Sequence, residues 1–186
     1  FDCCGVSDGA AAAIVCRADM AKKFRQDPVF VKSMQISVSS GEEMLYTKWD
    51  GSHVEPGYRA GIAAYKEAGI KNPREEVSMA EVHDCFSITE AVTMEDLQFS
   101  ARGKVKDDID AGRFNSDGAQ PIQIDGGLKC FGHPIGASGL RMMYEMYKQL
   151  QGKADKRQLK DPKVGLTHNM GGFPSMCVVS VCIVGK

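Results

Sequence analysis

The chain has 186 residues, and its 23 Lys and Arg residues nearly balance its 24 Asp and Glu residues, which gives a formal net charge of -1 at pH 7. This balance leaves no positive excess to attract nucleic acid or an anionic membrane surface, so neither is expected as a partner. Hydrophobic residues make up 43% and charged residues 25% of the sequence, a composition that excludes disordered and fibrous classes. The length suits one domain with a sizeable core.

The longest nearly apolar run, residues 176–184, is far shorter than the roughly 20 residues that a membrane-spanning helix needs. No charged-then-apolar signal segment opens the chain, and we expect a soluble, cytoplasmic protein. Its seven cysteines include no C-x-x-C pair and are too sparse for a disulfide scaffold, so we expect free thiols and no metal site. The sequence opens on Phe1 rather than Met, and we expect it to be part of something longer.

In chain order, short apolar segments alternate with helical ones, the pattern of a layered α/β domain. Residues 9–16 and 34–39 could form strands, although the alanine run of residues 9–16 fits a helix equally well by propensity. Small residues recur at helical spacing over residues 57–68, and Gly69 follows as a stop signal. This stretch therefore predicts a helix.

Two strand-to-helix junctions follow. Residues 77–82 predict a buried strand, and apolar residues between 88 and 97 predict the helix after it. Residues 122–124 alternate like a strand, and the apolar residues from 140 to 150 mark one face of a second helix. Between the junctions, residues 100–120 are rich in Gly, Asp, Lys and Arg and predict an exposed loop with one short helix.

The first motif that could carry chemistry is the tetrad His83-Asp84-Cys85-Phe86, at the end of the strand predicted over residues 77–82. Cys85 falls near a helix N-terminus, where backbone N–H groups and the helix dipole favour a thiolate over a thiol. Such a cysteine could exchange protons near neutral pH. The same residues also fit a structural role, with Cys85 as a small buried residue and His83 as a hydrogen-bonded core histidine.

The second motif covers residues 126–139, with the sequence GGLKCFGHPIGASG. Pro134 keeps His133 out of the helical region, and the glycines on either side leave little bulk, so the imidazole is presented outward. Just before a helix the ring is biased toward its neutral form, which can donate an N–H to an oxygen that gains negative charge. Two alternatives stay open at this point: a phosphate cradle at the helix start, and a purely structural turn.

The third motif is His168-Asn169-Met170-Gly171-Gly172, in a turn that we expect at residues 168–174. That turn would join strands at residues 164–167 and 177–184 into an antiparallel hairpin. Backbone N–H groups beside paired glycines can approach a substrate and act as oxyanion donors, and His168 and Asn169 add polar side chains. An ordinary hairpin turn explains the same residues equally well.

These three motifs, together with the DGAAA run at residues 8–12, resemble the thiolase superfamily in both order and spacing. The sequence is most similar to the sterol carrier protein-type and lipid-transfer-protein-like thiolases, which carry His-Asp-Cys-Phe where biosynthetic thiolases have Asn-Glu-Ala-Phe. The resemblance implies an α/β fold, a thiolase-fold half with a mixed five-stranded sheet layered between helices. It assigns residues 1–25 to the tail of the N-terminal thiolase half, its last strand and helix, and residues 26–186 to the C-terminal thiolase domain.

The resemblance also implies residue roles. His133 matches the histidine that activates the nucleophile and lines the oxyanion hole, and His83 matches the position that holds a water in that hole. Cys85 matches the acid/base thiol that this subgroup places in the tetrad, because the usual Cys-x-Gly motif near the C-terminus is replaced by residues 168–171. His168, Asn169, Met170 and Gly171 would then line the substrate and the second oxyanion hole.

The segment at the start of the chain departs from the nucleophile motif of the family. Cys3 and Cys4 match instead a loop that runs near bound coenzyme A, so Cys4, Gly5 and Ser7 are expected to lie close to that ligand. The nucleophilic cysteine would lie in the N-terminal half, which this sequence largely lacks, and the chain alone is expected to be inactive. Expected partners are that half, acyl-CoA and CoA, with a homodimer or tetramer in the parent enzyme and a small accessory subunit as a further candidate.

The activity implied is CoA-dependent acyl transfer: thiolysis of a 3-oxoacyl-CoA or the reverse Claisen condensation. No permanently bound cofactor is expected, since coenzyme A thioesters are the substrates. Two alternatives remain from other classes. One is a thiolase-like aldolase, which keeps the fold without the nucleophile, and the other is a non-catalytic partner subunit of a thiolase complex.

Overall fold

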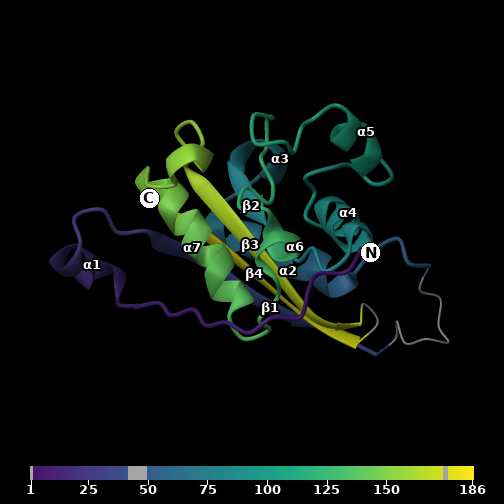
Figure 1. Cartoon of the computed structure of the whole chain (residues 1–186), viewed down its shortest axis with the longest axis horizontal. Coiled ribbons are helices and arrows are strands. Elements are labelled where there is room, and N and C mark those ends of the chain that lie inside the picture. Colours follow the sequence, from purple (N-terminus) through teal and green to yellow (C-terminus); the bar gives the residue numbers. More distant parts are fainter. Residues whose placement is uncertain (1, 42–49, 174–175) are drawn as a thin grey trace.

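The computed structural model describes residues 2–41, 50–173 and 176–186. Within these residues the centre of the fold is a four-stranded mixed sheet in the order β1 (Phe30–Val38), β4 (Met176–Gly185), β3 (Val164–Phe173) and β2 (Met79–Glu81). β4 runs antiparallel to both of its neighbours, whereas β2 pairs with β3 in parallel (Figure 1). The parallel pair places the end of β2 beside the middle of β3.

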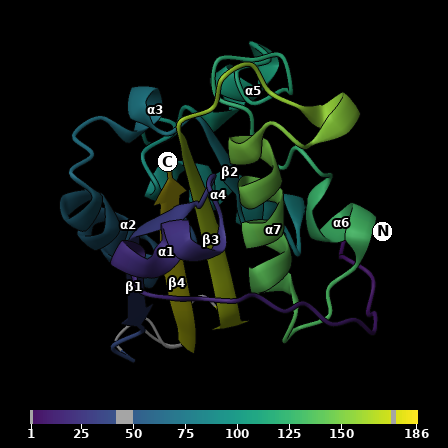
Figure 2. The same ribbon diagram turned by 90° about the vertical axis from the view of Figure 1, so that its left-hand side faces the viewer.

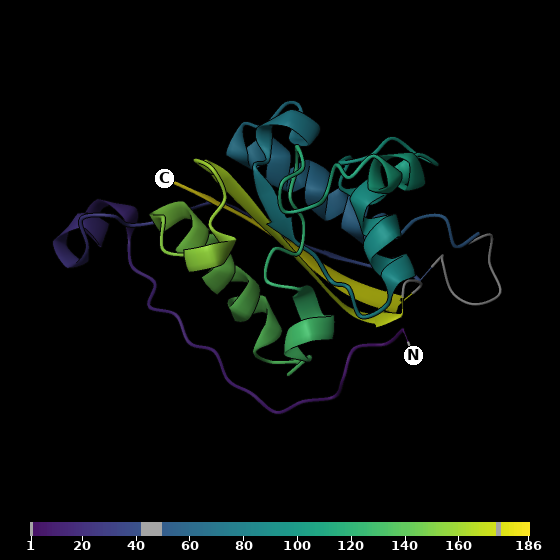
Figure 3. The ribbon, with the colours of Figure 1, turned by 45° about the horizontal axis from the view of Figure 1, so that its top comes forward.

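Helices cover the two faces of this sheet. The helical segments are α1 (Ala18–Phe24), α2 (Glu55–Ala68), α3 (Pro73–Glu76), α4 (Ser87–Asp96), α5 (Val105–Asp110), α6 (Gly127–Phe131), α7 (Ser138–Gln151) and a 3-10 turn at Asp155–Arg157. α2 packs on β1 and β4, while α7 lies along β3 on the opposite face (Figures 2 and 3). The layered α/β class that the sequence predicts is therefore confirmed.

Periodicity predicts most of these elements correctly. α2, α4 and α7 occupy the stretches where apolar or small residues recur at helical spacing, and α5 is the short helix of the 100–120 loop. The main core forms where α2 and α4 meet the sheet, around side chains such as Leu97, Leu166 and Ile183. A second cluster, around Met146 and Leu150, lies beneath α7.

The sheet of the described residues has four strands where the resemblance implies five, and the strand predicted at residues 122–124 does not form. Only Ile122 pairs with β2, as an isolated parallel bridge to Ala80. On one side of it Pro121 has no N–H to donate, and on the other Gln123 adopts a left-handed backbone with φ of 56°. The strand is interrupted after a single residue because neither neighbour can continue the ladder.

The turn predicted at residues 168–174 is also wrong. β3 continues through His168 to Phe173, and its partner β4 begins at Met176, so the motif lies in the strand; Pro174, like Phe1 of the opening segment, lies outside the described residues. At the other end of the chain, residues 9–16 form neither strand nor helix and run in an extended path across α7 (Figure 1). The structure leaves the proposed boundary at residue 25 as a prediction.

A buried hydroxyl of α2 offers a test of the core. Tyr65 is buried and donates from its phenol to the carbonyl of Leu97 at 2.7 Å. Tyr65→Phe removes that donor and leaves a buried carbonyl with one fewer hydrogen bond, so we expect a loss of about 1–2 kcal/mol in the free energy of unfolding, measured by urea denaturation. Tyr58→Phe, at an exposed position of the same helix, is the matched control and should unfold like the parent.

Candidate active site

The first part of the site follows the end of β2. Glu81 of β2 pairs with Thr167 of β3, and this register brings His83 beside His168, where the backbone nitrogen of His83 lies 3.5 Å from Nδ1 of His168. The chain then turns at Cys85 and enters α4 at Ser87. A strand that is buried on both faces thus delivers the tetrad to the carboxyl edge of a parallel strand pair, where ligands of α/β proteins usually bind.

Two side chains fix this turn. The carboxylate of Asp84, itself buried, accepts the N–H of Leu128 at 2.8 Å, at the start of α6. Gln123 uses both ends of its amide on the backbone of Val82, accepting its N–H at 3.1 Å and donating to its carbonyl at 2.7 Å. The tetrad and the glycine-rich segment are therefore tied together by hydrogen bonds that begin within one residue of His83.

His133 completes the group. It follows α6 in the glycine-rich turn, and its imidazole lies edge-on to that of His83, with ring centroids 5.1 Å apart and an angle of 77° between the ring planes. Nδ1 of His133 lies 2.7 Å from Oγ of Ser138, the first residue of α7. The structure thus brings His83 and His133, which are 50 positions apart in sequence, into ring contact.

The opening segment, residues 2–7, contacts both the tetrad and the glycine-rich turn that carries His133. The N–H of Cys4 donates to the carbonyl of Cys85 at 3.0 Å. The N–H of His133 is shared between the carbonyl of Gly5, at 3.2 Å, and Oγ of Ser7, at 2.9 Å. The three residues that we expect near coenzyme A are therefore placed directly against the tetrad and the His133 turn.

The Asp2 carboxylate anchors this segment. It forms an ion pair with Lys129 of α6 at 2.5 Å and accepts the N–H and hydroxyl of Ser87 at the start of α4, at 3.0 and 2.9 Å. These bonds, that with Lys129 first, lower the pKa of Asp2 to about 2. Through Asp2, the opening segment therefore connects the start of α4 to α6.

The sulfur of Cys85 is half-buried. It lies 3.7 Å from Oγ1 of Thr89, one turn along in α4. Burial, followed by the nearby Cys85 and Asp84, raises the pKa of the Cys4 thiol. The thiols of Cys4 and Cys85, from distant parts of the sequence, are therefore close enough to interact electrostatically.

The deeper histidines are neutral at physiological pH. His83 is 5% exposed and His168 is 2% exposed. Burial, together with the neighbouring His133, lowers the pKa of His83 to about 4. Burial, together with His83, lowers that of His168 to about 3.

The first four residues of the third motif, those expected to line the substrate, divide between the two faces of β3. His168 and Met170 point into the core, where Nε2 of His168 approaches Gly57 of α2, so both are shielded from solvent. Asn169 points the other way, against Gly139 in the first turn of α7, and Gly171 is exposed. Their proposed contacts with substrate stay predictions, and His168 contacts His83 in this structure.

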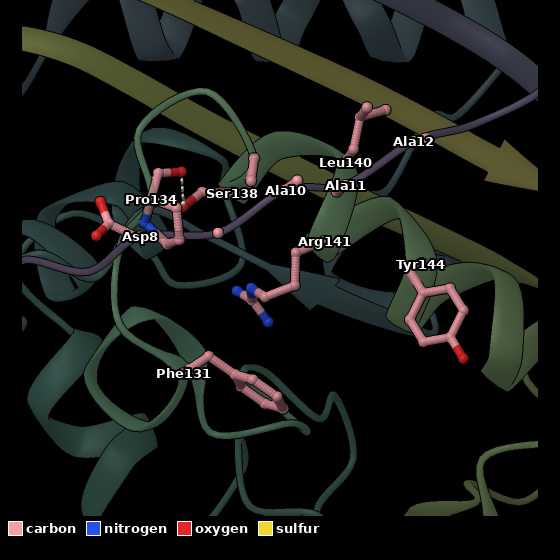
Figure 4. A pocket seen from close by; sticks show the side chains of 12 residues that line it. Asp8, Ala10, Ala11, Ala12, Phe131, Pro134, Ser138, Leu140, Arg141 and Tyr144 are labelled. Carbon is pink, nitrogen blue, oxygen red and sulfur yellow. Dashed lines mark hydrogen bonds between the residues drawn. The ribbon is translucent and has the colours of Figure 1, made fainter.

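A cavity of about 400 Å³ lies beside the His133 turn, between residues 8–12 and α7. Figure 4 shows Arg141 pointing into it, with the ring of Phe131 on one side of the guanidinium and that of Tyr144, from the same helix as Arg141, on another. The guanidinium of Arg141 lies 5.2 Å from the centroid of the Phe131 ring and pairs with Asp125. The cavity continues from the site along the first turns of α7.

Sequence reasoning missed three residues that shape the site: Asp84, Gln123 and Ser138. Asp84 lies inside the tetrad without a predicted role, although a carboxylate is a common partner for the free N–H groups of a helix start. Ser138 lies five positions after His133, a separation that carries no recognisable spacing rule. Gln123 had no signal, because its role depends on a left-handed backbone that sequence does not predict for glutamine.

Across residues 2–41, 50–173 and 176–186, no three His, Cys, Asp or Glu side chains are grouped so that they could hold a metal ion. The same part of the chain contains no helix with the length and apolarity to span a membrane.

Comparison with known proteins identifies the family. A sequence model described as "Thiolase C-terminal domain-like" matches residues 39–184. The chain is 38% identical over 181 residues to an acetyl-CoA acetyltransferase of Methanothermobacter thermautotrophicus, and the match covers 97% of this chain and 46% of that protein. It is 36% identical over 176 residues to sterol carrier protein 2 of Gallus gallus, and this match covers 92% of this chain and 31% of that protein.

The chain therefore belongs to the thiolase C-terminal domain-like family, and it spans less than half the length of these relatives. A solved structure named Ltp2-ChsH2(DUF35) aldolase superposes with a TM-score of 0.72 and 22% identity, covering 86% of this chain and 40% of that one. This last likeness concerns the fold. Together they agree with the thiolase half that the motifs predict.

Two glycines of the same segment provide a matched test of the turn. Gly127 has a left-handed φ of 66°, and a Cβ there would lie 2.4 Å from Oδ2 of Asp84. Gly127→Ala should therefore lower the free energy of unfolding by about 2 kcal/mol or more. At Gly136 a Cβ meets nothing within 4 Å, so Gly136→Ala should stay within about 0.5 kcal/mol of the parent. Equal losses in urea denaturation would contradict this account of the turn.

The lowered pKa values of His83 and His168 predict a distinctive pH response. Because both folded-state values lie below the ordinary value of 6.5, protonation favours the unfolded chain. Each ring therefore weakens the fold progressively as the pH falls below about 6.5. In NMR spectra, the ring resonances of both should keep their neutral positions from about pH 7.5 to about pH 5. A midpoint near 6.5 for either ring would show that it is solvated.

Proposed function

We propose that this chain supplies the acid/base and oxyanion groups of a thiolase-type acyltransferase that acts on coenzyme A thioesters. The observation that carries the proposal is the ring contact of His83 and His133. Cys85, whose thiol is half-buried, follows His83 by two positions in the sequence. Family membership supports it, and so do relatives named acetyl-CoA acetyltransferase. The nucleophilic cysteine would come from a segment or chain that provides the other half of the site.

The reaction divides among these groups as follows. In thiolysis, the nucleophilic thiol loses its proton to the imidazole of His133 and attacks the 3-oxo carbonyl of the 3-oxoacyl-CoA; the C2–C3 bond breaks, the acyl group stays on the thiol, and the enolate of acetyl-CoA departs. The thiol of CoA then takes the acyl group from the enzyme. In condensation, the nucleophilic thiol attacks the thioester carbonyl of the donor acyl-CoA and CoA departs as the thiol. His133 and a water held by His83 donate hydrogen bonds to the oxygen that gains negative charge. In thiolysis, Cys85 donates a proton to the departing enolate carbon, and in condensation it removes one from the same carbon.

The opening segment and the cavity would bind the substrate. Cys4, Gly5 and Ser7 already contact the tetrad and the His133 turn, so a ligand beside them would present its thioester to those groups. The cavity beside α7 combines a cation, Arg141, with aromatic walls. Its size and lining suit part of an acyl-CoA.

Thiolysis of acetoacetyl-CoA by CoA tests the proposal. The assay uses the chain together with the segment or subunit that carries the nucleophile, and acetyl-CoA is measured by chromatography. Cys85→Ala and His133→Ala should each lower kcat by about 100-fold or more, because each removes a proton-transfer group. Cys130→Ser is the matched control: its thiol is exposed on α6, and the variant should retain the parent rate.

The outcomes separate the alternatives. Parental activity in Cys85→Ala would overturn the assigned role of that thiol. Cleavage of a 3-hydroxyacyl-CoA in the absence of CoA would replace thiolysis with retro-aldol chemistry, the activity in the name of the superposed aldolase. Binding of the partner without turnover of either substrate would assign the chain to a non-catalytic subunit.

A further inference from the structure

Ser138 is the one side chain that contacts the ring of His133 through a hydrogen bond among the described residues. Its hydroxyl oxygen lies 2.7 Å from Nδ1 of His133 and 3.2 Å from the carbonyl oxygen of Pro134. Figure 4 shows the second of these contacts at the start of α7. Ser138 is only 1% exposed, so solvent does not compete for the hydroxyl. Its two neighbours therefore determine where the hydroxyl hydrogen points.

A count of hydrogens decides the arrangement. The hydroxyl has one hydrogen, and a carbonyl oxygen can only accept. Both contacts are hydrogen bonds only if Ser138 donates to the Pro134 carbonyl and accepts from Nδ1–H of His133. In the opposite arrangement the hydrogen points at Nδ1, and two oxygens face each other at 3.2 Å with no hydrogen between them.

The Pro134 carbonyl is suited to this third donor. It already accepts the N–H of Ala137 at 2.8 Å and that of Ser138 at 3.0 Å, the sharing typical of a helix end. The backbone of His133 is held independently by Gly5 and Ser7, so the ring can turn only about its own side-chain bonds. The contact with Ser138 then fixes which ring nitrogen points into α7.

We propose that Ser138 is a positioning residue that holds neutral His133 as the tautomer with its hydrogen on Nδ1, so that Nε2 carries a free lone pair on the opposite side of the ring. This inference deepens the proposed function and its catalytic part rests on it, because a lone pair on Nε2 is what can take the proton of a nucleophilic thiol. After that transfer both ring nitrogens carry hydrogen. Nδ1 still donates to Ser138, and Nε2–H can donate to the developing oxyanion.

The tautomer can be measured without any turnover. In ¹⁵N-labelled protein at a pH where the ring is neutral, long-range ¹H–¹⁵N correlations should show Nδ1 as the protonated nitrogen and Nε2 as the bare one; the signals are assigned by their loss in His133→Gln. In Ser138→Ala the population should move toward Nε2–H, while Ser138→Thr keeps the hydroxyl and should restore the parental tautomer. A parental protein with its hydrogen on Nε2 would overturn the inference, as would an unchanged tautomer in Ser138→Ala.

Kinetics of the assembled enzyme give the second readout. Ser138→Ala should lower kcat about 10- to 100-fold with little change in KM, because the ring is misdirected while substrate contacts remain. Ser138→Thr should recover most of the rate. Ser33→Ala is the matched control: that serine is 2% exposed and donates to Glu67 at 2.7 Å, but it lies on β1 and should leave kcat unchanged.

The two readouts fail separately. If no thiolysis is found but His133 has its hydrogen on Nδ1 in a manner that depends on Ser138, the proposed function is wrong and the structural inference stands. If thiolysis occurs and Ser138→Ala keeps both the parental tautomer and the parental kcat, the inference is wrong and the function stands. Should Ser138→Ala fail to fold, Ser138→Thr and the tautomer of the parent still decide the question.

Discussion

The buried carboxylate of Asp84 links the tetrad to the glycine-rich turn, and the geometry of the site depends on that link. It accepts the N–H of Leu128 at 2.8 Å, and its second oxygen occupies the space that a side chain at position 127 would need. A carboxylate at a helix start is stabilised by free N–H groups and by the helix dipole, which offsets the cost of burying it. α6 is thereby held against the end of β2, and His133, which follows α6, is placed next to His83.

Gln123 shows why the sheet has four strands in the described residues and why this matters for the site. Its left-handed backbone ends the pairing that Ile122 begins with β2. The side chain then replaces the missing ladder, because its amide bonds both the N–H and the carbonyl of Val82. A side-chain amide satisfies the same backbone groups as a fifth strand would. It also frees the following residues to turn toward α6, which a continuing strand would prevent.

Sequence patterns predict the features that depend on neighbouring residues alone, such as the positions of the longer helices. Helical spacing identified α2, α4 and α7, and the three motifs indicated residues that the fold does bring together, His83 and His133 above all. What escaped prediction depends on contacts between distant segments. The length of the β3–β4 hairpin follows from its ladder, which extends to Phe173 and Met176, and that ladder turns His168 into the core. The sequence does not indicate how deeply a polar residue beside paired glycines is buried, because a turn and the end of a strand share that composition.

The three histidines form a series of increasing exposure, from His168 through His83 to the half-buried His133. Burial keeps the inner two neutral, and each lies close enough to the next to disfavour a second positive charge. In the proposed reaction this favours hydrogen-bond donation over fixed charge. A water held by neutral His83 stabilises an oxyanion as it develops without binding the ground-state carbonyl as strongly as a cation would, and only a donor that discriminates in this way accelerates the chemical step. The outermost ring is the one that must gain and lose a proton, and it is also the one whose second nitrogen is held by a serine in the first turn of α7.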